Sequence, residues 1–197
     1  MNSVNLKINN FIEETKVEGP FIRSAVWLQG CSILCEECCN PHMQNFDDGN
    51  EVEIAKLYTS ILSAKMKNPE TEGLTILGGE PLDQAKSLGI LLEKLKEKIT
   101  NYGIILFTGY NWREVEKDSE KIKTAELCDL VIAGPYIKSL KSASRRWIGS
   151  DNQVAKFITD RYSKLLTPWP KGIIEFEITF KDSEISFNGT PTEGKIL

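Results

Sequence analysis

Apolar residues recur along the chain with two different spacings, and these predict strands that alternate with helices. Short segments with alternating or continuous apolar residues are expected to be strands: "VNLKINNF", "FIRSAVWLQG", "GLTILGG", "GIILFTG" and "CDLVIAGP". Apolar residues at helical spacing predict helices over residues 52–67, 83–99, 112–127 and around 153–162. Strands that alternate with helices in this way indicate parallel βαβ units whose strand ends share one edge of a sheet.

The last part of the chain has a different pattern. In "GIIEFEITFKDSEISFNGTP" two alternating runs flank the polar residues 181–183, which predicts an antiparallel hairpin over about 172–190 at the edge or end of the α/β core. Too few strands are visible for an eight-stranded barrel, so the expected fold is a partial, open parallel β/α barrel with a C-terminal hairpin. The sequence has no internal repeat and no linker rich in Gly, Pro or Ser, so we expect one domain over residues 1–197.

Composition and charge narrow the range of partners. The chain of 197 residues is 41% hydrophobic and 26% charged, as is typical of a globular domain. Its net charge of −4 provides no positive field for a polyanion, so we expect no nucleic acid partner. The first residues, "MNSVNLKINNFIEE", lack the features of a signal peptide, and no segment approaches the roughly 18 apolar residues of a membrane helix. We therefore expect a cytoplasmic protein with no membrane partner. Thiols stay reduced in the cytoplasm.

Four of the five cysteines lie in the segment "WLQGCSILCEECCNPHM", which predicts metal or redox chemistry. Cys31, Cys35 and Cys38 have the spacing C-x3-C-x2-C, and Cys39 follows directly. A structural zinc site usually takes two separated pairs of ligands; His42 could supply a fourth ligand here, so zinc stays open as an alternative. Three thiolates on one loop suit three irons of a 4Fe-4S cluster. The fourth iron would then be free, and an open coordination position is typical of a reaction centre.

The cysteine loop after an early strand, followed one helix later by "GGEP", resembles the radical S-adenosylmethionine (SAM) superfamily. This resemblance implies a partial β/α barrel in which Cys31, Cys35 and Cys38, within the loop 30–42, hold a 4Fe-4S cluster. It also implies that SAM chelates the unique iron through its amino and carboxylate groups. Reduction of the cluster would cleave SAM to a 5'-deoxyadenosyl radical, and no side chain beyond the ligands of the cluster and of SAM would be catalytic.

The resemblance also assigns residues around SAM. The glycine-rich turn would bind the methionine amino group through its backbone, where glycine leaves room for a close approach. A strand-end hydroxyl would meet the SAM carboxylate or ribose, with a turn or N-cap role as the alternative, and the glutamate of the turn could instead favour the helix that follows. The family usually has an aromatic residue after the third cysteine; here a cysteine takes its place, and adenine is contacted by it as a soft substitute or by other residues. The turn is formed by Gly78, Gly79 and Glu80, the hydroxyl belongs to Thr108, and the cysteine is Cys39. Asn152 is a further residue that the resemblance places near SAM.

Further segments resemble, in order, the small activating enzymes of glycyl radical proteins, among them the activases of anaerobic ribonucleotide reductase. These segments are "WLQGC", "CNPHMQNFDDG", "LFTGYNWREV", "CDLVIAGPYI", "RRWIGSDNQ" and "ISFNGTP". This resemblance implies that the radical abstracts hydrogen from a glycine of a large partner enzyme, with flavodoxin or ferredoxin as the electron donor. Relatives commonly have an acidic residue where this chain has Ala133. The alternatives are a radical SAM enzyme for a small molecule or a ribosomal peptide, and a non-enzymatic zinc or iron-sulfur binding module.

Overall fold

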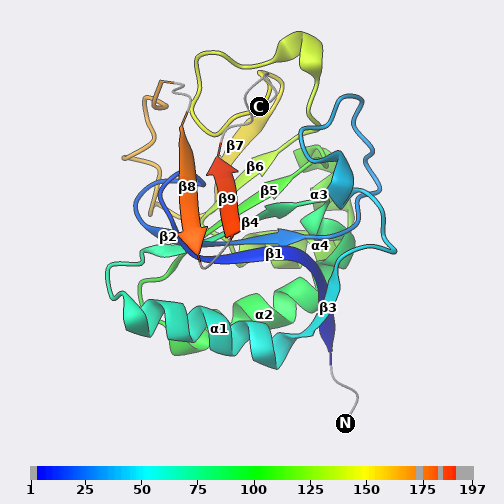
Figure 1. Ribbon diagram of the computed structural model, residues 1–197. Helices are drawn as coiled ribbons and strands as arrows, with labels where there is room; N and C mark the ends of the chain where they lie inside the picture. Colours follow the sequence, from blue (N-terminus) through cyan, green and yellow to red (C-terminus); the bar gives the residue numbers. More distant parts are fainter. Residues whose placement is uncertain (1–3, 172–174, 182–183, 190–197) are drawn as a thin grey trace.

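The computed structural model describes residues 4–171, 175–181 and 184–189, which form an α/β protein built on a seven-stranded sheet (Figure 1). The strands follow the order β3-β1-β2-β4-β5-β6-β7. Their bounds are β1 Asn5–Thr15, β2 Arg23–Leu28, β3 Asn50–Glu53, β4 Gly73–Gly78, β5 Gly103–Thr108, β6 Leu130–Ala133 and β7 Val154–Phe157. The neighbours β2, β4, β5 and β6 are parallel, as predicted, whereas β1, β3 and β7 pair antiparallel. This order establishes an open mixed sheet; it does not establish a barrel.

Helices cover one face of this sheet, and α1 and α2 lie side by side beneath it in Figure 1. The helices are α1 Ile54–Lys67, α2 Ala85–Lys98, α3 Trp112–Lys117 and α4 Ser119–Glu126, with 3-10 turns η1 Pro41–Met43, η2 Pro81–Gln84 and η3 Lys138–Leu140. The predicted helix 112–127 is divided at Asp118, whose carboxylate accepts the N–H groups of Glu120 and Lys121 at the start of α4. In the part of the chain that the structure describes, no helix has the length and apolarity needed to cross a membrane.

The helix predicted around 153–162 is wrong. Residues Val154–Phe157 form β7, which pairs antiparallel with β6 from Leu130 opposite Phe157 to Ala133 opposite Val154. Turns follow this strand, and Ile158 donates its N–H to the carbonyl oxygen of Asp129. A short apolar run fits a strand and a helix equally well by spacing alone. The unpaired edge of β6 decides the outcome, because it supplies the backbone hydrogen bonds of a strand.

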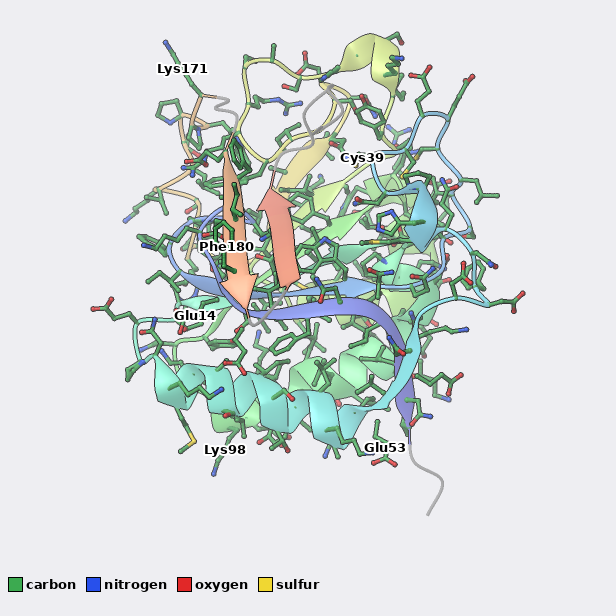
Figure 2. All side chains as sticks on the ribbon, in the orientation of Figure 1. Glu14, Cys39, Glu53, Lys98, Lys171 and Phe180 are labelled. Carbon is green, nitrogen blue, oxygen red and sulfur yellow. The ribbon has the colours of Figure 1, made fainter. Side chains whose placement is uncertain are left out.

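The predicted C-terminal hairpin is confirmed as a separate two-stranded sheet of β8 Phe176–Lys181 and β9 Glu184–Gly189. Its expected limits near 172 and 190 fall outside the described residues. The hairpin lies across the face of the sheet that α1 and α2 leave free (Figure 1). The Glu177 carboxylate attaches it to the end of β1 by accepting the Thr15 hydroxyl at 2.7 Å and the Lys16 N–H at 2.8 Å. Phe180 projects outward with 74% of its surface exposed (Figure 2).

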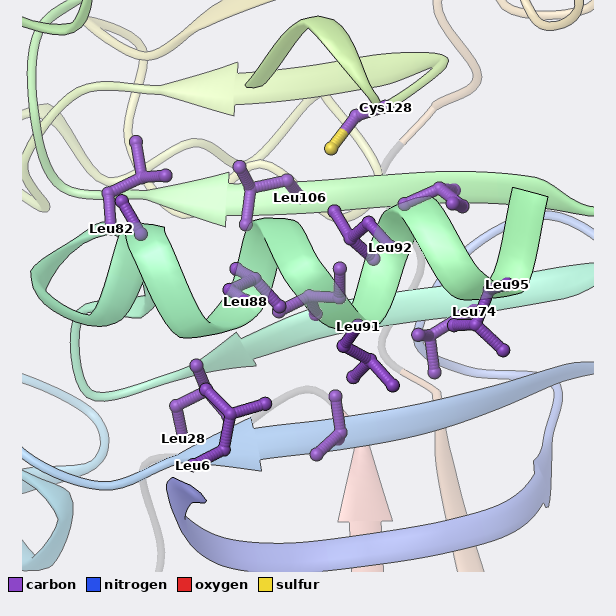
Figure 3. Packing of buried hydrophobic residues seen from close by; sticks show 14 of the residues in the cluster. Leu6, Leu28, Leu74, Leu82, Leu88, Leu91, Leu92, Leu95, Leu106 and Cys128 are labelled. Carbon is purple, nitrogen blue, oxygen red and sulfur yellow. The ribbon is translucent and has the colours of Figure 1, made fainter. Parts of the chain in front are cut away.

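The central strands are buried on both faces. On the helix side, Leu88, Leu91, Leu92 and Leu95 of α2 pack among strand residues that include Leu74 (Figure 3). Cys128 belongs to the same cluster as a fully buried thiol. The opposite faces of β5 and β6 contribute Ile105, Leu130 and Ile132 to a second cluster, which also contains Ile148, Tyr162 and Leu166. Packing on both faces fixes the carboxyl ends of β2, β4, β5 and β6 at one edge of the sheet.

Candidate iron-sulfur site

The cysteine loop leaves the sheet at this edge, directly after β2. Its base is closed by two backbone hydrogen bonds, from Gly30 N–H to the Met43 carbonyl at 2.9 Å and from Cys31 N–H to the Gln44 carbonyl at 3.0 Å. Leu34 and Glu37 have positive φ angles of 52° and 57°, so the loop curls tightly between its anchored ends. Figure 2 shows Cys39 on the side of the sheet away from α1 and Lys98.

The four thiols of this loop are free, and their environments differ. Burial raises the pKa of Cys31 and of Cys35, although backbone N–H groups directed at both sulfurs oppose this effect. The pKa of Cys38 is lowered because the thiol of Cys39 donates a hydrogen bond to it, and the Asn40 N–H lies 3.4 Å from the Cys38 sulfur. The same bond raises the pKa of Cys39. Cys38 is therefore the thiol that ionises most readily, and Cys39 acts as its hydrogen-bond donor.

The donor set fits a cluster better than a single metal ion. In residues 4–171 and the described parts of the hairpin, no three His, Cys, Asp or Glu side chains are grouped so as to hold one ion. His42 is exposed in η1 and joins no such group among the described residues, and a zinc site would need a fourth ligand beside the three cysteines. A 4Fe-4S cluster is bound by one thiolate for each iron, so its ligands stand around a larger object and need not converge on one atom. Three soft thiols on one loop meet this requirement.

The glycine turn after β4 is joined to the base of the cysteine loop. Gly79 donates its N–H to the Leu28 carbonyl at 2.8 Å, and Glu80 donates its N–H to the Gly30 carbonyl at 2.7 Å. A Cβ on Gly78, which has φ 117°, would lie 2.4 Å from the backbone of Leu28, and one on Gly79 would lie 2.2 Å from the Gly30 oxygen. Glycine is therefore required here by the chain's own backbone. Because these N–H groups are already bonded, the carbonyl oxygens of the turn are the groups suited to an incoming ammonium donor.

Glu80 links the ends of two strands. Its carboxylate is fully buried and accepts the Thr108 hydroxyl at 2.7 Å, the Gly109 N–H at 2.6 Å and the Leu82 N–H at 2.8 Å. The Leu82 bond caps η2, which is the alternative role considered for this residue. Thr108 is directed at Glu80 and also accepts the Tyr110 N–H at 3.2 Å, as a turn hydroxyl does. Burial raises the pKa of Glu80 to about 7, because three donors offset only part of the loss of hydration.

The raised pKa of Glu80 predicts a pH effect on stability. Between the ordinary value of 4.5 and about 7, the folded chain holds a proton on Glu80 that the unfolded chain has released. The free energy of unfolding should therefore fall as pH rises through this window. Glu80→Gln should remove this part of the slope in urea unfolding of the cluster-free chain, whereas Glu93→Gln on the exposed side of α2 should leave the slope unchanged. Equal slopes in the wild type and Glu80→Gln would contradict the assignment.

Asp83 and Gln84 make a second set of polar contacts after the turn, which was not predicted from the sequence. Asp83 accepts the Ser32 N–H at 2.7 Å, the Ser32 hydroxyl at 2.8 Å and the Tyr110 hydroxyl at 2.7 Å. Gln84 donates to the carbonyl oxygens of Lys7 at 2.9 Å and Gln29 at 3.1 Å. The available signal was the polar pair that ends "GGEPLDQ", immediately before an amphipathic helix. Together with Glu80, these side chains tie the turn to β1, β2 and β5.

Asn152 lies beside the same edge, in the segment before β7. Its amide nitrogen donates to the Pro135 carbonyl at 2.7 Å, while its side-chain oxygen is buried and has no hydrogen-bond partner among the described residues. Gln153 donates to the Gly134 carbonyl at 2.9 Å, and Gly134 in turn donates its N–H to the Thr108 carbonyl. The two amides therefore support the loop after β6, and the Asn152 oxygen has an unused capacity to accept a hydrogen bond.

The presence of alanine at position 133, where relatives commonly have an acidic residue, has a physical explanation. Ala133 pairs with Thr108 in the sheet, is 1% exposed and belongs to the cluster beneath the helices. An acidic side chain at this place would need a partner to offset its burial. Alanine instead completes the packing at the end of β6.

Comparison with protein families adds the deciding observation: residues 17–156 match the 4Fe-4S single cluster domain, over more than half of the chain. The chain belongs to the 4Fe-4S single cluster domain family. Membership in this family confirms the predicted cofactor, a 4Fe-4S cluster. The matched range contains the whole cysteine loop, the glycine turn and the end of β5, whereas the hairpin of β8 and β9 lies beyond it.

Among curated proteins, the chain is similar to several anaerobic ribonucleoside-triphosphate reductase-activating proteins. The protein of Enterobacteria phage T4 is 28% identical over 139 residues, which is 70% of this chain and 85% of the phage protein. The protein of Pasteurella multocida is 26% identical over 144 residues, or 70% of this chain and 89% of that protein. The protein of Escherichia coli K12 is 25% identical over 140 residues, or 70% and 90%. These relatives confirm the resemblance on which the sequence interpretation rested.

Proposed function

We propose that this member of the 4Fe-4S single cluster domain family is a radical SAM enzyme that generates a glycyl radical on a partner enzyme. The observation that carries the proposal is the hydrogen-bonded junction between the cysteine loop and the glycine turn, at Leu28, Gly30, Gly79 and Glu80. This junction holds a cluster-binding loop directly beside a turn whose carbonyl oxygens suit the amino group of SAM. The named activity of the relatives agrees with this use of the site.

The proposal gives each group of residues a role. Cys31, Cys35 and Cys38 bind the cluster, and Cys39 donates a hydrogen bond to the Cys38 sulfur, which stabilises its thiolate form. The carbonyl oxygens of Gly78 and Gly79 receive the SAM ammonium group. The unpartnered amide oxygen of Asn152 is available to a hydroxyl or amino donor of SAM.

Thr108, Glu80 and Cys39 support the turn and the cluster ligands or lie close to the proposed SAM site. Thr108 and Glu80 hold the turn and the end of β5 in register through their mutual hydrogen bond, and Thr108 is the polar residue of β5 nearest the proposed SAM site. Cys39 is the soft side chain that replaces the usual aromatic neighbour of adenine. When bound, the reduced cluster supplies one electron for the cleavage of SAM to a 5'-deoxyadenosyl radical. The chain's own contribution is to bind and orient.

The proposal extends to the setting of the reaction. Residues 1–197 act as one radical SAM unit with a partial barrel, in the reducing environment of the cytoplasm. Flavodoxin or ferredoxin supplies the electron. The partner is a glycyl radical enzyme, and the reductase named in the relatives' descriptions makes anaerobic ribonucleotide reductase the first candidate.

A deuterium-transfer experiment tests this function. The candidate reductase is prepared with glycine deuterated at the α carbon and is incubated anaerobically with the reconstituted chain, SAM and dithionite. We expect deuterium in 5'-deoxyadenosine and a glycyl radical signal in the electron paramagnetic resonance (EPR) spectrum of the reductase. Unlabelled 5'-deoxyadenosine with no radical on the reductase would exclude this partner and favour a small molecule or ribosomal peptide as substrate.

A further inference from the structure

Asp83 is bonded to the cysteine loop at its first cluster-binding residue. One carboxylate oxygen accepts the Ser32 N–H at 2.7 Å, and the other accepts the Ser32 hydroxyl at 2.8 Å. Ser32 follows Cys31 directly, so the bonded N–H belongs to the peptide group that joins Cys31 to Ser32. The orientation of this peptide limits where the Cys31 sulfur can point.

Tyr110 contacts the same carboxylate oxygen as the Ser32 hydroxyl. The Tyr110 hydroxyl lies 2.7 Å from this oxygen of Asp83 and 2.9 Å from the Ser32 hydroxyl, so the three oxygen atoms form a ring in which the two hydroxyl protons make two hydrogen bonds at a time. The three residues come from the cysteine loop, η2 and the segment between β5 and α3. Because they are far apart in sequence, the ring exists only in the folded chain.

Asp83 and Glu80 belong to the same turn, but their carboxylates contact different parts of the chain. Glu80 joins the glycine turn to β5: its carboxylate accepts hydrogen bonds from Leu82, Thr108 and Gly109, which lie outside the cysteine loop. Asp83 is the carboxylate of this turn that reaches the loop itself. The N–H groups of Gly30 and Cys31 already bond the base of the loop. Asp83 adds a contact that fixes the following peptide group, between Cys31 and Ser32.

We propose that Asp83 is a positioning residue for the cluster: it fixes the Cys31–Ser32 peptide, and through it the Cys31 thiolate, relative to the SAM-binding turn, while Tyr110 holds the Asp83 carboxylate in place. This inference rests on the proposed function, because it concerns the bound cluster. Groups that hydrogen-bond to the surroundings of metal ligands orient those ligands, and their loss typically weakens metal binding or activity about 10- to 100-fold.

Two variants test the proposal by cluster retention, which does not depend on turnover. Asp83→Asn keeps the side-chain shape but removes the negative charge and leaves one acceptor oxygen in place of two, so the Ser32 N–H and the two hydroxyls can no longer all donate to it. We expect the reconstituted variant to lose iron to an anaerobic ferrous chelator about 10-fold faster than the wild type or more. The EPR change of the reduced cluster on addition of SAM should also be altered. Tyr110→Phe keeps both Ser32 bonds and should give a smaller change in the same direction.

Asp129→Asn is a matched control. Asp129 also accepts a backbone N–H, from Ile104 at 2.8 Å, and a hydroxyl, from Thr159 at 2.6 Å, but it lies at the opposite ends of the parallel strands. This variant should destabilise the cluster-free chain in urea without changing iron loss or the EPR response. A ring that only stabilised the fold would make Asp83→Asn behave like this control.

The outcomes separate the inference from the function on which it rests. A wild-type chain that takes up no cluster would contradict the proposed function. A wild-type chain with a stable cluster, together with Asp83→Asn that retains iron equally long and responds equally to SAM, would overturn the positioning role alone. If Asp83→Asn fails to fold, Tyr110→Phe decides: wild-type retention and an unaltered EPR response would overturn the role, whereas faster loss would support it.

Discussion

Replacing Cys31, Cys35 or Cys38 with alanine is expected to abolish SAM cleavage, with 5'-deoxyadenosine falling to the level seen without protein. Each variant removes one of the three thiolates proposed to bind the iron atoms, and the described chain offers no grouped set of His, Cys, Asp or Glu side chains as a replacement. Anaerobic reconstitution with iron and sulfide, followed by iron analysis and a product assay with dithionite and SAM, measures both effects. Iron content should fall well below that of the wild type in every case.

Cys39→Ala is the matched control, because Cys39 neighbours a ligand and shares its loop. This variant removes the hydrogen bond to Cys38 and should raise the pKa of the Cys38 thiol. It should still take up a cluster, because the three proposed ligands remain. Undiminished turnover in Cys35→Ala, or loss of the cluster in Cys39→Ala with retention in Cys38→Ala, would contradict the assignment of ligands.

Gly79→Ala is expected to have the second largest effect. The added Cβ would lie 2.2 Å from the Gly30 oxygen and 2.7 Å from the Met43 oxygen, both of which are backbone atoms. The turn and the base of the cysteine loop must therefore move apart. Overpacking of this kind costs about 1–3 kcal/mol of stability. It should also separate the cysteine loop from the turn proposed to bind SAM, and we expect 5'-deoxyadenosine formation to fall about 100-fold or more, since displacement by about 1 Å can have such an effect.

Gly89→Ala provides the comparison for this prediction. Gly89 lies within α2, where a new Cβ meets only the Thr124 side chain, at 3.0 Å. Alanine is favoured over glycine in a helix by about 1 kcal/mol, which opposes the cost of the contact with Thr124, so this variant should change stability much less than Gly79→Ala. Urea unfolding and the product assay measure both variants. Wild-type product formation by Gly79→Ala would show that the close junction is not needed for the reaction.

The central strands and the main helices could be predicted because local patterns determine them. The buried segments from Leu74 to Ile76 and from Ile104 to Leu106 are typical of strands with both faces covered. The four leucines of α2 define one buried face in the same way. The cysteine spacing and the glycine turn are also local, so the cluster loop and its neighbour could be recognised without the fold.

Other features depend on contacts between distant segments. Residues 154–157 are a strand because β6 presents an unpaired edge, which spacing within that segment does not reveal. The break at Asp118 depends on a side-chain cap within an apparently continuous helical pattern. Asp83 acquires its role from Ser32 and Tyr110, which lie 51 and 27 positions away. Gly79 and Thr108, which are predicted to contact SAM, also contact the chain's own groups: Gly79 packs closely on Gly30, and the Thr108 hydroxyl donates to Glu80.

The most direct test of the central claim is the reaction of the wild-type chain itself. The protein is reconstituted anaerobically with iron and sulfide, its metal content and absorption are measured, and 5'-deoxyadenosine is quantified after addition of SAM and dithionite. The account predicts iron-sulfur absorption, and product only when cluster, SAM and reductant are all present. A chain that holds about one zinc with no iron absorption, or one that is loaded with iron yet forms no 5'-deoxyadenosine, would contradict it.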